Sequence, residues 1–286
     1  MSGAVPVKRI GFAYNPTIEA ATELRERAAD WAQANGVSHW AAAAAERAEL
    51  HKELPGTDVL IVLGGDGTFL RAARAVIEDD VPLLGINVGK IGFLSKVEAG
   101  ELERVLGQLV AGEYAIEERM ALEGRILRAD GGSSESDRLL ALNDVVVARG
   151  SLARVVRLEV SIDTSHLATF IADGLVVASP TGSTGYSFSA GGPILDPTAR
   201  NLVVTPIAGY LTTIRSVVVG PEVVVSCRVL DANEALVSID GREDLPIAVG
   251  DVVQVRAIER PIRFVEPEGS VAFWDLFRQK VQLLPS

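Results

Sequence analysis

The stretch that decides the fold is Asp58-Val59-Leu60-Ile61-Val62-Leu63-Gly64-Gly65-Asp66-Gly67-Thr68-Phe69-Leu70-Arg71-Ala72-Ala73-Arg74. It begins as an unbroken apolar run, which is typical of a strand buried on both faces of a parallel sheet. After the glycines, Leu70, Ala73 and Ile77 recur at helical spacing. A buried strand that leads through a glycine-rich turn into a helix is where α/β proteins bind phosphorylated ligands.

The turn itself holds three glycines around one carboxylate. Gly64, Gly65 and Gly67 permit positive φ angles and a close approach of phosphate to backbone amides. Asp66 would repel phosphate, so its expected uses are to hold a cation or to take a proton from a hydroxyl. An Asp-Gly hairpin is disfavoured because helical spacing follows the turn, whereas a strand-to-helix turn without a ligand stays an alternative.

Composition excludes several classes of protein. The chain has 286 residues, of which 48% are hydrophobic, and a formal net charge of -11. Acidity speaks against nucleic-acid and anionic-membrane partners, and no apolar run approaches the ~20 residues of a membrane span. One cysteine, no apolar N-terminal leader and three histidines predict a cytoplasmic protein without an internal disulfide or a zinc site.

The order of strand-like and helix-like patterns along the chain predicts two domains and a terminal helix. Residues 1–116 alternate strands and helices, which indicates an α/β domain with a parallel, Rossmann-like sheet. Within it, residues 37–40 are expected as a short strand and the alanine-rich residues 41–50 as a helix. Residues 117–265 carry β-branched runs and predict an all-β, antiparallel domain. Residues 266–286 predict a helix that packs back on the first domain.

Three further stretches are polar where a plain scaffold would not be. Asn87-Val88-Gly89-Lys90-Ile91-Gly92-Phe93-Leu94 follows a strand of the same sheet as Asp66, although an ordinary turn is an equal alternative. Asn143-Asp144 interrupts an apolar run, so its amide and carboxylate need partners. A ribose could provide them, and so could a satisfied edge position.

The third stretch is Asp173-Gly174, followed by the uncharged, hydroxyl-rich loop at residues 179–193. A flexible linker shares such glycine and serine content, but it rarely carries aromatic residues such as Tyr186 and Phe188. A loop whose amides and hydroxyls surround a polar ligand is the preferred interpretation. The Gly-x-Ser-x-Gly motif of serine hydrolases is absent. Asp240-Gly241 is more typical of a hairpin turn than of a site.

Together these stretches resemble the NAD kinase family. The Gly-Gly-Asp-Gly turn alone is also found in lipid kinases and phosphofructokinases, whereas its combination with the other motifs is highly specific. The matching motifs run in the family's order: Gly64-Gly65-Asp66-Gly67-Thr68, Asn87-x-Gly89-x-x-Gly92-Phe93-Leu94, Asn143-Asp144, Asp173-Gly174, Thr181-Gly182-Ser183-Thr184-x-Tyr186-Ser187, Gly191-Gly192-Pro193-Ile194, Thr205-Pro206-Ile207 and Ile239-Asp240-Gly241.

The resemblance implies a phosphotransferase that moves the γ-phosphate of ATP, or a phosphate of polyphosphate, to the 2′-hydroxyl of the adenosine ribose of NAD, giving NADP. It further implies a Mg²⁺ requirement without an assigned direct protein ligand, a cytoplasmic homodimer or homotetramer, and a site between the two domains. The alternatives are a lipid or sugar kinase that shares the turn, and a non-catalytic NAD(P)-binding sensor.

The resemblance also assigns roles to residues. Asp66 would be the general base or a metal-linked positioner, and Gly64, Gly65 and Thr68 would form the phosphate loop. The residues that would contact NAD are Gly67, Phe93, Asn143, Asp144, Asp173, Thr184, Tyr186 and Ser187, with Arg71 and Asp240 as further candidates. The chain departs from the family at Gly185, where alanine is usual, and at Ala208-Gly209-Tyr210, which lacks a common histidine.

Overall fold

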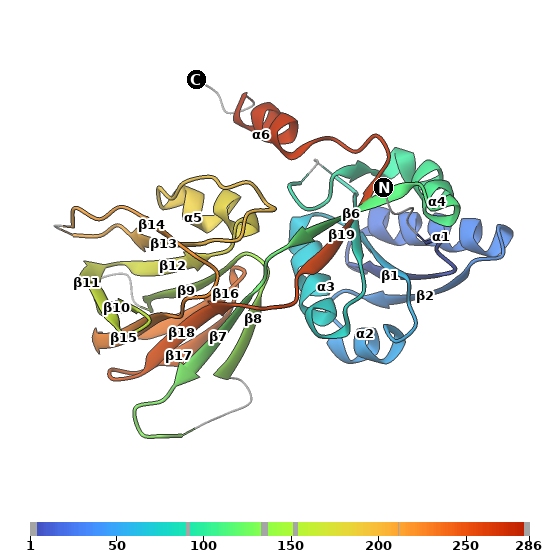
Figure 1. Ribbon diagram of the computed structural model, residues 1–286. Helices are drawn as coiled ribbons and strands as arrows, with labels where there is room; N and C mark the ends of the chain where they lie inside the picture. The colour runs from blue at the N-terminus through green and yellow to red at the C-terminus, as the bar shows by residue number, and fades with distance from the viewer. Residues whose placement is uncertain (1–4, 90–91, 133–136, 151–153, 211, 283–286) are drawn as a thin grey trace. The chain divides into compact units, whose positions relative to one another are not determined.

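The computed structural model describes residues 5–89, 92–132, 137–150, 154–210 and 212–282 (Figure 1). The chain forms two compact units. Unit 1 comprises Met1–Glu118 and Ile262–Ser286, and unit 2 comprises Arg119–Pro261.

Unit 1 is built on a sheet with the strand order β2-β1-β3-β4-β19-β6, and β5 pairs with β4. The pairs β1–β2, β1–β3, β3–β4, β4–β5 and β4–β19 are parallel, so the expected parallel sheet is confirmed. Every residue of β3 and β4 is buried, as their apolar runs predict. The strands are β1 (Arg9–Tyr14), β2 (Ser38–Ala43), β3 (Val59–Leu63), β4 (Leu83–Asn87), β5 (Val97–Glu98), β6 (Tyr114–Arg119) and β19 (Ile262–Pro267).

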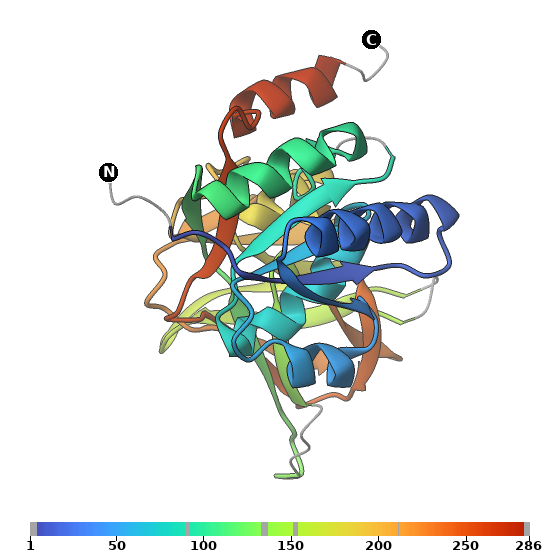
Figure 2. The same cartoon turned by 90° about the vertical axis from the view of Figure 1, so that its right-hand side faces the viewer.

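Helices cover both faces of this sheet. Helix α1 (Glu19–Ala34) and helix α4 (Leu102–Ala111), which follows the short helix η1 (Ala99–Glu101), share one apolar core with β1, β3 and β4. Helix α2 (Arg47–Glu53) packs with helix α3 (Asp66–Asp79) on the other face. Figure 2 shows α1 and α4 on one side of the unit 1 sheet and α2 on the other.

The prediction of a helix over residues 41–50 is wrong. Strand β2 continues to Ala43, and helix α2 begins only at Arg47. Ala41 and Ala42 pair with Phe12 and Ala13 of β1 in parallel register. Alanine's helix propensity is a weak preference of less than about 1 kcal/mol per residue, and strand pairing at the sheet edge overrides it.

The C-terminal segment returns to unit 1. The expected all-β domain extended to residue 265, but β19 belongs to the parallel sheet, because Phe264 pairs with Leu83 of β4. The ring centroid of Phe264 also lies 5.2 Å from that of Phe69. A buried ion pair of 2.7 Å between Lys96 and Glu266 fastens the same strand. Helix α6 (Phe273–Gln282) follows, and its aromatic rings contact Phe93, which confirms the packing on the first domain.

Unit 2 consists of two antiparallel sheets around one apolar core, as expected. Their orders are β11-β10-β15-β18-β7-β8 and β14-β13-β12-β9-β16-β17. Two short helices, η3 (Thr181–Thr184) and α5 (Tyr186–Ser189), follow β12. The strands are β7 (Leu122–Leu127), β8 (Arg138–Ala141), β9 (Asp144–Arg149), β10 (Val156–Ile162), β11 (Ser165–Ala172), β12 (Gly174–Ala178), β13 (Leu202–Ile207), β14 (Val217–Val219), β15 (Val225–Asp231), β16 (Ala235–Ile239), β17 (Arg242–Ile247) and β18 (Val252–Ala257).

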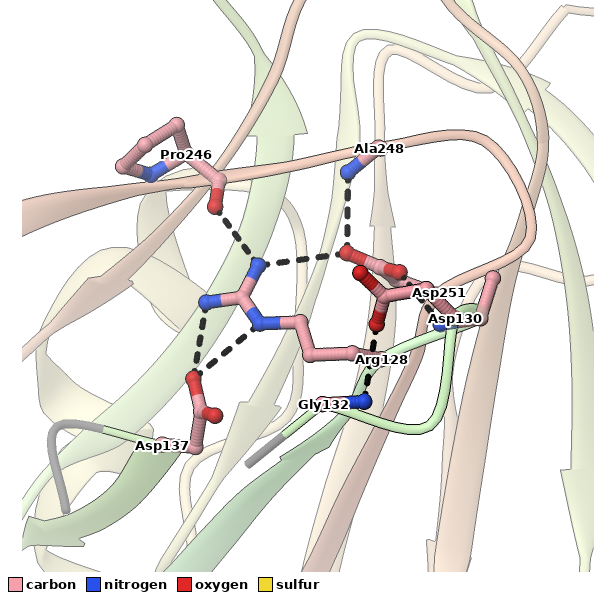
Figure 3. A network of polar contacts seen from close by, with 8 residues as sticks. Arg128, Asp130, Gly132, Asp137, Pro246, Ala248 and Asp251 are labelled. Atoms are coloured by element: carbon pink, nitrogen blue, oxygen red, sulfur yellow. Dashed lines mark hydrogen bonds and ion pairs between the residues drawn. The ribbon is translucent and has the colours of Figure 1, made fainter. Parts of the chain in front are cut away.

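An arginine ties four strand ends of unit 2 together. Figure 3 shows the guanidinium of Arg128, just after β7, donating to Asp137 at 2.7 Å, to the Pro246 carbonyl at 2.9 Å and to Asp251 at 3.2 Å. These partners precede β8, lie in β17 and precede β18. Strands β7 and β8 pair as an antiparallel hairpin, and residues 133–136 of its connection lie outside the described part.

Candidate active site

Asp66 is the first residue of helix α3, directly after the turn that ends strand β3. Gly64 has φ 155°, and its amide donates to the carbonyl of Ile86 in the neighbouring strand. The carbonyl of Gly65 accepts the amides of Thr68 and Phe69, which begins the helix. The turn therefore delivers Asp66 to the carboxyl end of the parallel sheet, at the N-terminus of a helix, where the quoted motif predicts it.

The carboxylate of Asp66 holds the loop that follows strand β4. Its Oδ2 accepts the amide of Phe93 at 2.9 Å, and its Oδ1 accepts the amides of Leu94 at 3.1 Å and Ser95 at 3.2 Å. A Cβ at Gly92 would lie 1.8 Å from Asp66 Oδ1, so only glycine fits there. The structure thus brings together two of the sequence motifs, Gly64–Thr68 and the Asn87–Leu94 stretch.

This bonding pattern leaves the carboxylate with capacity for one further partner. An ionised carboxylate offers about four acceptor positions, of which Asp66 uses three for these amides. The remaining position is on Oδ2. Asp66 is partly exposed and Gly67 is exposed, so a substrate hydroxyl or a hydrated cation can approach.

Phe93 connects this loop to the C-terminal helix. Its ring lies 6.1 Å from the ring of Phe273 and 6.4 Å from that of Phe277, and the ammonium of Lys280 lies 4.9 Å from its centroid. The family resemblance assigns Phe93 to contact with NAD and does not predict the α6 contacts. The aromatic stripe of α6 was the one available signal.

In unit 2, Asp240 performs a similar task on another backbone segment. It sits in the turn between β16 and β17 with φ 51°, and its carboxylate accepts the amides of Leu142 at 3.1 Å, Asn143 at 2.7 Å and Asp144 at 3.2 Å. Its own amide donates to the carbonyl of Asp144. Asp240 is therefore both a turn residue, as its sequence suggests, and the holder of the Asn143-Asp144 motif.

The carboxyl groups of Asp144 and Asp240 interact with each other in unit 2. Burial, and after it the charge of Asp240, raise the pKa of Asp144 from 3.8 to about 7. Asp144 can therefore change its protonation state near neutral pH, which suits a group that exchanges hydrogen bonds with a ligand hydroxyl.

Two buried polar atoms beside this pair have no hydrogen-bond partner in the described part of the chain. They are Asn143 Oδ1 and Thr181 Oγ1. Such an atom costs about 1–3 kcal/mol when unpaired, so it marks a place where a ligand or water is needed. Thr181 was absent from the predicted site residues, although its motif was recognised.

The loop at residues 179–193 folds against the same motif. A Cβ at Gly182 would lie 2.1 Å from the carbonyl oxygen of Asn143, and a Cβ at Gly185 would lie 3.7 Å from Asn143 Nδ2 and 3.8 Å from Asp144 Oδ2. The structure therefore joins this loop to Asn143-Asp144. Gly185 is the position next to both polar side chains.

Most hydroxyls of this loop hold the loop itself. Ser179 Oγ donates to the carbonyl of Leu142, and Ser183 Oγ donates to that of Pro180. Thr184 Oγ1 donates to the carbonyl of Thr181, and the fully buried Ser187 Oγ lies 3.3 Å from Thr205 Oγ1. By contrast, the Tyr186 side chain is 46% exposed and available to a ligand.

Asp173 lies away from this group. It precedes β12 and forms a two-bond ion pair with Arg149, at 2.8 Å and 3.2 Å, whereas Asp144 pairs with Ala178 at the other end of the same strand. A strand of this length separates its two ends by on the order of 15 Å. The structure therefore does not bring Asp173 to Asp144 within one chain.

Arg71 is the last of the predicted site residues, and residues 208–210 are a departure from the usual family pattern. Arg71 lies on α3, partly buried, beyond the first turn of the helix. At the departure from the usual pattern, Ala208 adopts φ 47°, and Tyr210 is 64% exposed with its amide bonded to the Ile171 carbonyl.

Comparison with known proteins relates these features to a family. The model of the ATP-NAD kinase N-terminal domain matches residues 11–114, and that of the ATP-NAD kinase C-terminal domain matches residues 142–267. NAD kinase of Symbiobacterium thermophilum is 45% identical over 225 residues, covering 78% of each chain. NAD kinase of Heliobacterium modesticaldum is 38% identical over 281 residues, covering 96% of this chain and 98% of its own.

Solved structures show the same fold. A yeast NADH kinase complexed with NADH superimposes with a TM-score of 0.83 at 24% identity, covering 98% of this chain and 88% of the other. An NAD kinase from Archaeoglobus fulgidus in complex with ATP gives a TM-score of 0.78 at 24% identity, covering 96% and 99%. With both domain models matched in order and close relatives along most of its length, this chain belongs to the NAD kinase family.

Proposed function

We propose that this chain is a phosphotransferase that moves the γ-phosphate of ATP to the 2′-hydroxyl of the adenosine ribose of NAD, giving NADP. Membership of the NAD kinase family supports the reaction. The observation that carries it is the geometry of Asp66, a carboxylate held by three backbone amides with one acceptor position left on Oδ2.

Asp66 acts on the nucleophile in this proposal. A ribose hydroxyl is a weak nucleophile, and a fixed carboxylate that accepts its proton activates and aims it. Donor phosphates approach the turn at the partly exposed Gly65 and the exposed Gly67, while the amide of Gly64 is bonded to the Ile86 carbonyl and Thr68 packs against Gly64. Arg71 is a further cation on the same helix.

Asn143 and Asp144 bind ribose hydroxyls of NAD. The unpaired Asn143 Oδ1 accepts one hydrogen bond, and Thr181 Oγ1 supplies a second unpaired group beside it. Phe93 lines the adenine pocket with its ring, and Tyr186 offers an exposed aromatic face to the dinucleotide. Asp240 acts by holding the backbone amides of residues 142–144, and Ser187 acts through the contact of its hydroxyl with Thr205 Oγ1.

We also propose that Mg²⁺ accompanies the donor. Mg²⁺ keeps several waters and binds through one or two carboxylates together with substrate phosphates, so it needs few protein ligands. Within the described ranges no three His, Cys, Asp or Glu side chains are grouped as a metal site. If Asp66 is a metal-linked positioner rather than the base, its free Oδ2 position would hold such a hydrated ion in place of the hydroxyl, and the ion would neutralise charge on the donor phosphates.

Assembly and location complete the proposal. We expect a cytoplasmic homodimer or homotetramer, in which Asp173 and Arg149, far along β12 from Asp144, serve a neighbouring copy or its bound dinucleotide. Among the described residues, no helix is both long and apolar enough to span a bilayer.

The test is NADP formation by the purified chain with NAD, Mg²⁺ and ATP, repeated with polyphosphate as donor and with NADH as acceptor. We expect turnover with ATP, and Asp66→Asn should lower it by more than about 100-fold with the fold intact. Asp30→Asn, on the exposed face of α1, is the matched control. NAD binding without turnover under any combination would identify a sensor instead.

A further inference from the structure

The C-terminal helix reaches Phe93 with one face only. Phe273 and Phe277 lie on that face with their rings 6.3 Å apart, and both approach the Phe93 ring at just over 6 Å. One turn after Phe277, Lys280 places its ammonium 4.9 Å from the centroid of the same ring. On the exposed side, Arg278 pairs with Asp275.

The ammonium of Lys280 faces the Phe93 ring and forms no ion pair within the described ranges. A cation at this distance over a phenyl ring is attracted by the ring's quadrupole. Helix α6 therefore holds Phe93 through two aromatic contacts and one electrostatic contact.

The backbone of Phe93 is held from the other direction by Asp66. Its amide donates to Asp66 Oδ2, and the next two amides donate to Oδ1. Gly92 leaves no room for the loop to shift toward the carboxylate, since a Cβ there would lie 1.8 Å from Oδ1. A displacement of the loop that carries Phe93 therefore strains the bonds that orient Asp66.

We propose that helix α6 is a positioning element for Asp66, with Phe277 and Lys280 as positioning residues that act through Phe93. The catalytic consequence rests on the proposed function, because it assumes that Asp66 acts on the ribose hydroxyl. The mechanical coupling of α6 to the amides of residues 93–95 does not depend on that assumption. A misplacement of about 1 Å in a positioned group costs up to about 100-fold in rate.

The experiment compares Lys280→Met, which keeps the apolar stem but removes the charge, with Lys280→Arg, which keeps a cation for the ring. Phe277→Leu tests the aromatic contact, and Gln279→Ala on the exposed side of α6 is the control. Hydrogen exchange is followed for the amides of residues 93–95. Steady-state kinetics give kcat and both KM values, and thermal unfolding checks the fold.

We expect Lys280→Met and Phe277→Leu to accelerate exchange at residues 93–95 several-fold and to lower kcat about fivefold, with both KM values within about twofold of the original. Lys280→Arg should restore most of kcat. Exchange and kcat equal to those of Gln279→Ala would overturn the proposal. So would a raised donor KM with unchanged kcat and exchange, which would make Lys280 a phosphate ligand.

A chain without NAD kinase activity would refute the proposed function but not the coupling, because the exchange measurement decides the coupling without any substrate. Conversely, the variants could show faster exchange at residues 93–95 together with normal turnover. That result would mean that helix α6 does not affect catalysis and would refute its positioning role.

Discussion

At the scale of residues, two aspartates, one in each unit, hold backbone by the same physical device. Asp66 and Asp240 each present a carboxylate to three consecutive backbone amides, and each thereby fixes a segment that carries other site residues. Hydrogen bonds to a charged acceptor are roughly twice as strong as neutral ones. Both aspartates are therefore organisers of backbone as well as candidates for contact with substrate.

Gly92 gives a test of this organisation. Gly92→Ala puts a Cβ 1.8 Å from Asp66 Oδ1, so we expect the loop to lose its anchor and kcat/KM to fall by about 100-fold. Gly89→Ala is the matched control, because its Cβ would meet nothing nearer than Asn87 Oδ1 at 4.0 Å. Equal kinetics of the two variants would show that the Asp66 anchor is unimportant for turnover.

Asp144 predicts a pH dependence of stability. Its pKa of about 7 in the folded chain lies above the ordinary 3.8, so between these values the folded state keeps a proton that the unfolded state has lost. Stability at this site is therefore greatest below pH 4 and falls as the pH rises toward 7. The amide side chain of Asp144→Asn cannot ionise. The unfolding free energy of this variant should therefore increase relative to that of the original chain as the pH rises from 5 to 7.

The relative increase in the unfolding free energy of Asp144→Asn should not exceed about 1.4 kcal/mol per pH unit, and urea denaturation at several pH values measures it. Asp231→Asn, an exposed carboxyl of the same unit, serves as control and should show no such trend. A difference between Asp144→Asn and the original chain that stays constant from pH 5 to pH 8 would contradict the raised pKa.

At the scale of elements, the segment from β12 through η3 and α5 is a packed structure rather than an open glycine-serine loop. Ser179, Ser183 and Ser187 are each fully buried and hydrogen-bonded. The hydroxyls of Ser179 and Ser183 satisfy backbone groups where no regular ladder does, and that of Ser187 contacts the Thr205 hydroxyl. What remains for a ligand is the set of Asn143, Thr181 and Tyr186.

Two glycines of this element should respond differently to alanine. Gly185→Ala finds ordinary contacts apart from the Gly182 carbonyl at 3.3 Å, so stability should stay within about 1 kcal/mol and the KM for NAD within about threefold. Gly182→Ala would put its Cβ 2.1 Å from the Asn143 carbonyl and should cost about 1–3 kcal/mol or more.

Thermal unfolding and NAD kinetics of the two alanine variants give the comparison. A large loss of NAD binding in Gly185→Ala alone would mean that this chain needs the extra space beside Asn143 and Asp144, and that its departure from the family pattern serves a different acceptor.

At the scale of the whole molecule, unit 1 is closed by a segment from the far end of the chain. Strand β19 inserts between β4 and β6, and α6 then covers Phe93. Unit 2 is continuous in sequence, from Arg119 to Pro261. Unit 1 therefore cannot be completed until unit 2 has been synthesised, whereas unit 2 contains all of its own strands.

Cys227 reports on unit 2 as a whole. It is 1% exposed in the core, and burial raises the pKa of its thiol to about 12. Since the thiolate is the reactive form, we expect a thiol reagent to label the native chain only as fast as unit 2 opens, and NAD to slow this labelling. Absorbance during labelling in native buffer and in urea measures both rates. Rapid labelling in native buffer would mean that the core around Cys227 is open.

The sequence by itself determined the features that depend on local pattern. The apolar runs specify buried strands, the change of pattern near residue 117 separates the two kinds of sheet, and the glycine-aspartate turn marks the passage from β3 to α3. Side-chain periodicity and glycine placement act over a few residues, so one chain is enough to read them. The motifs also sufficed to identify the family.

Tertiary structure decided what depends on contacts between distant segments. Residues 41–43 became a strand because β1 offered an edge, and β19 joined the parallel sheet beside β4. The bonds of Asp66 to residues 93–95, of Asp240 to residues 142–144 and of α6 to Phe93 join segments far apart in sequence. No local period encodes such pairings, because they arise only when packing brings the segments together.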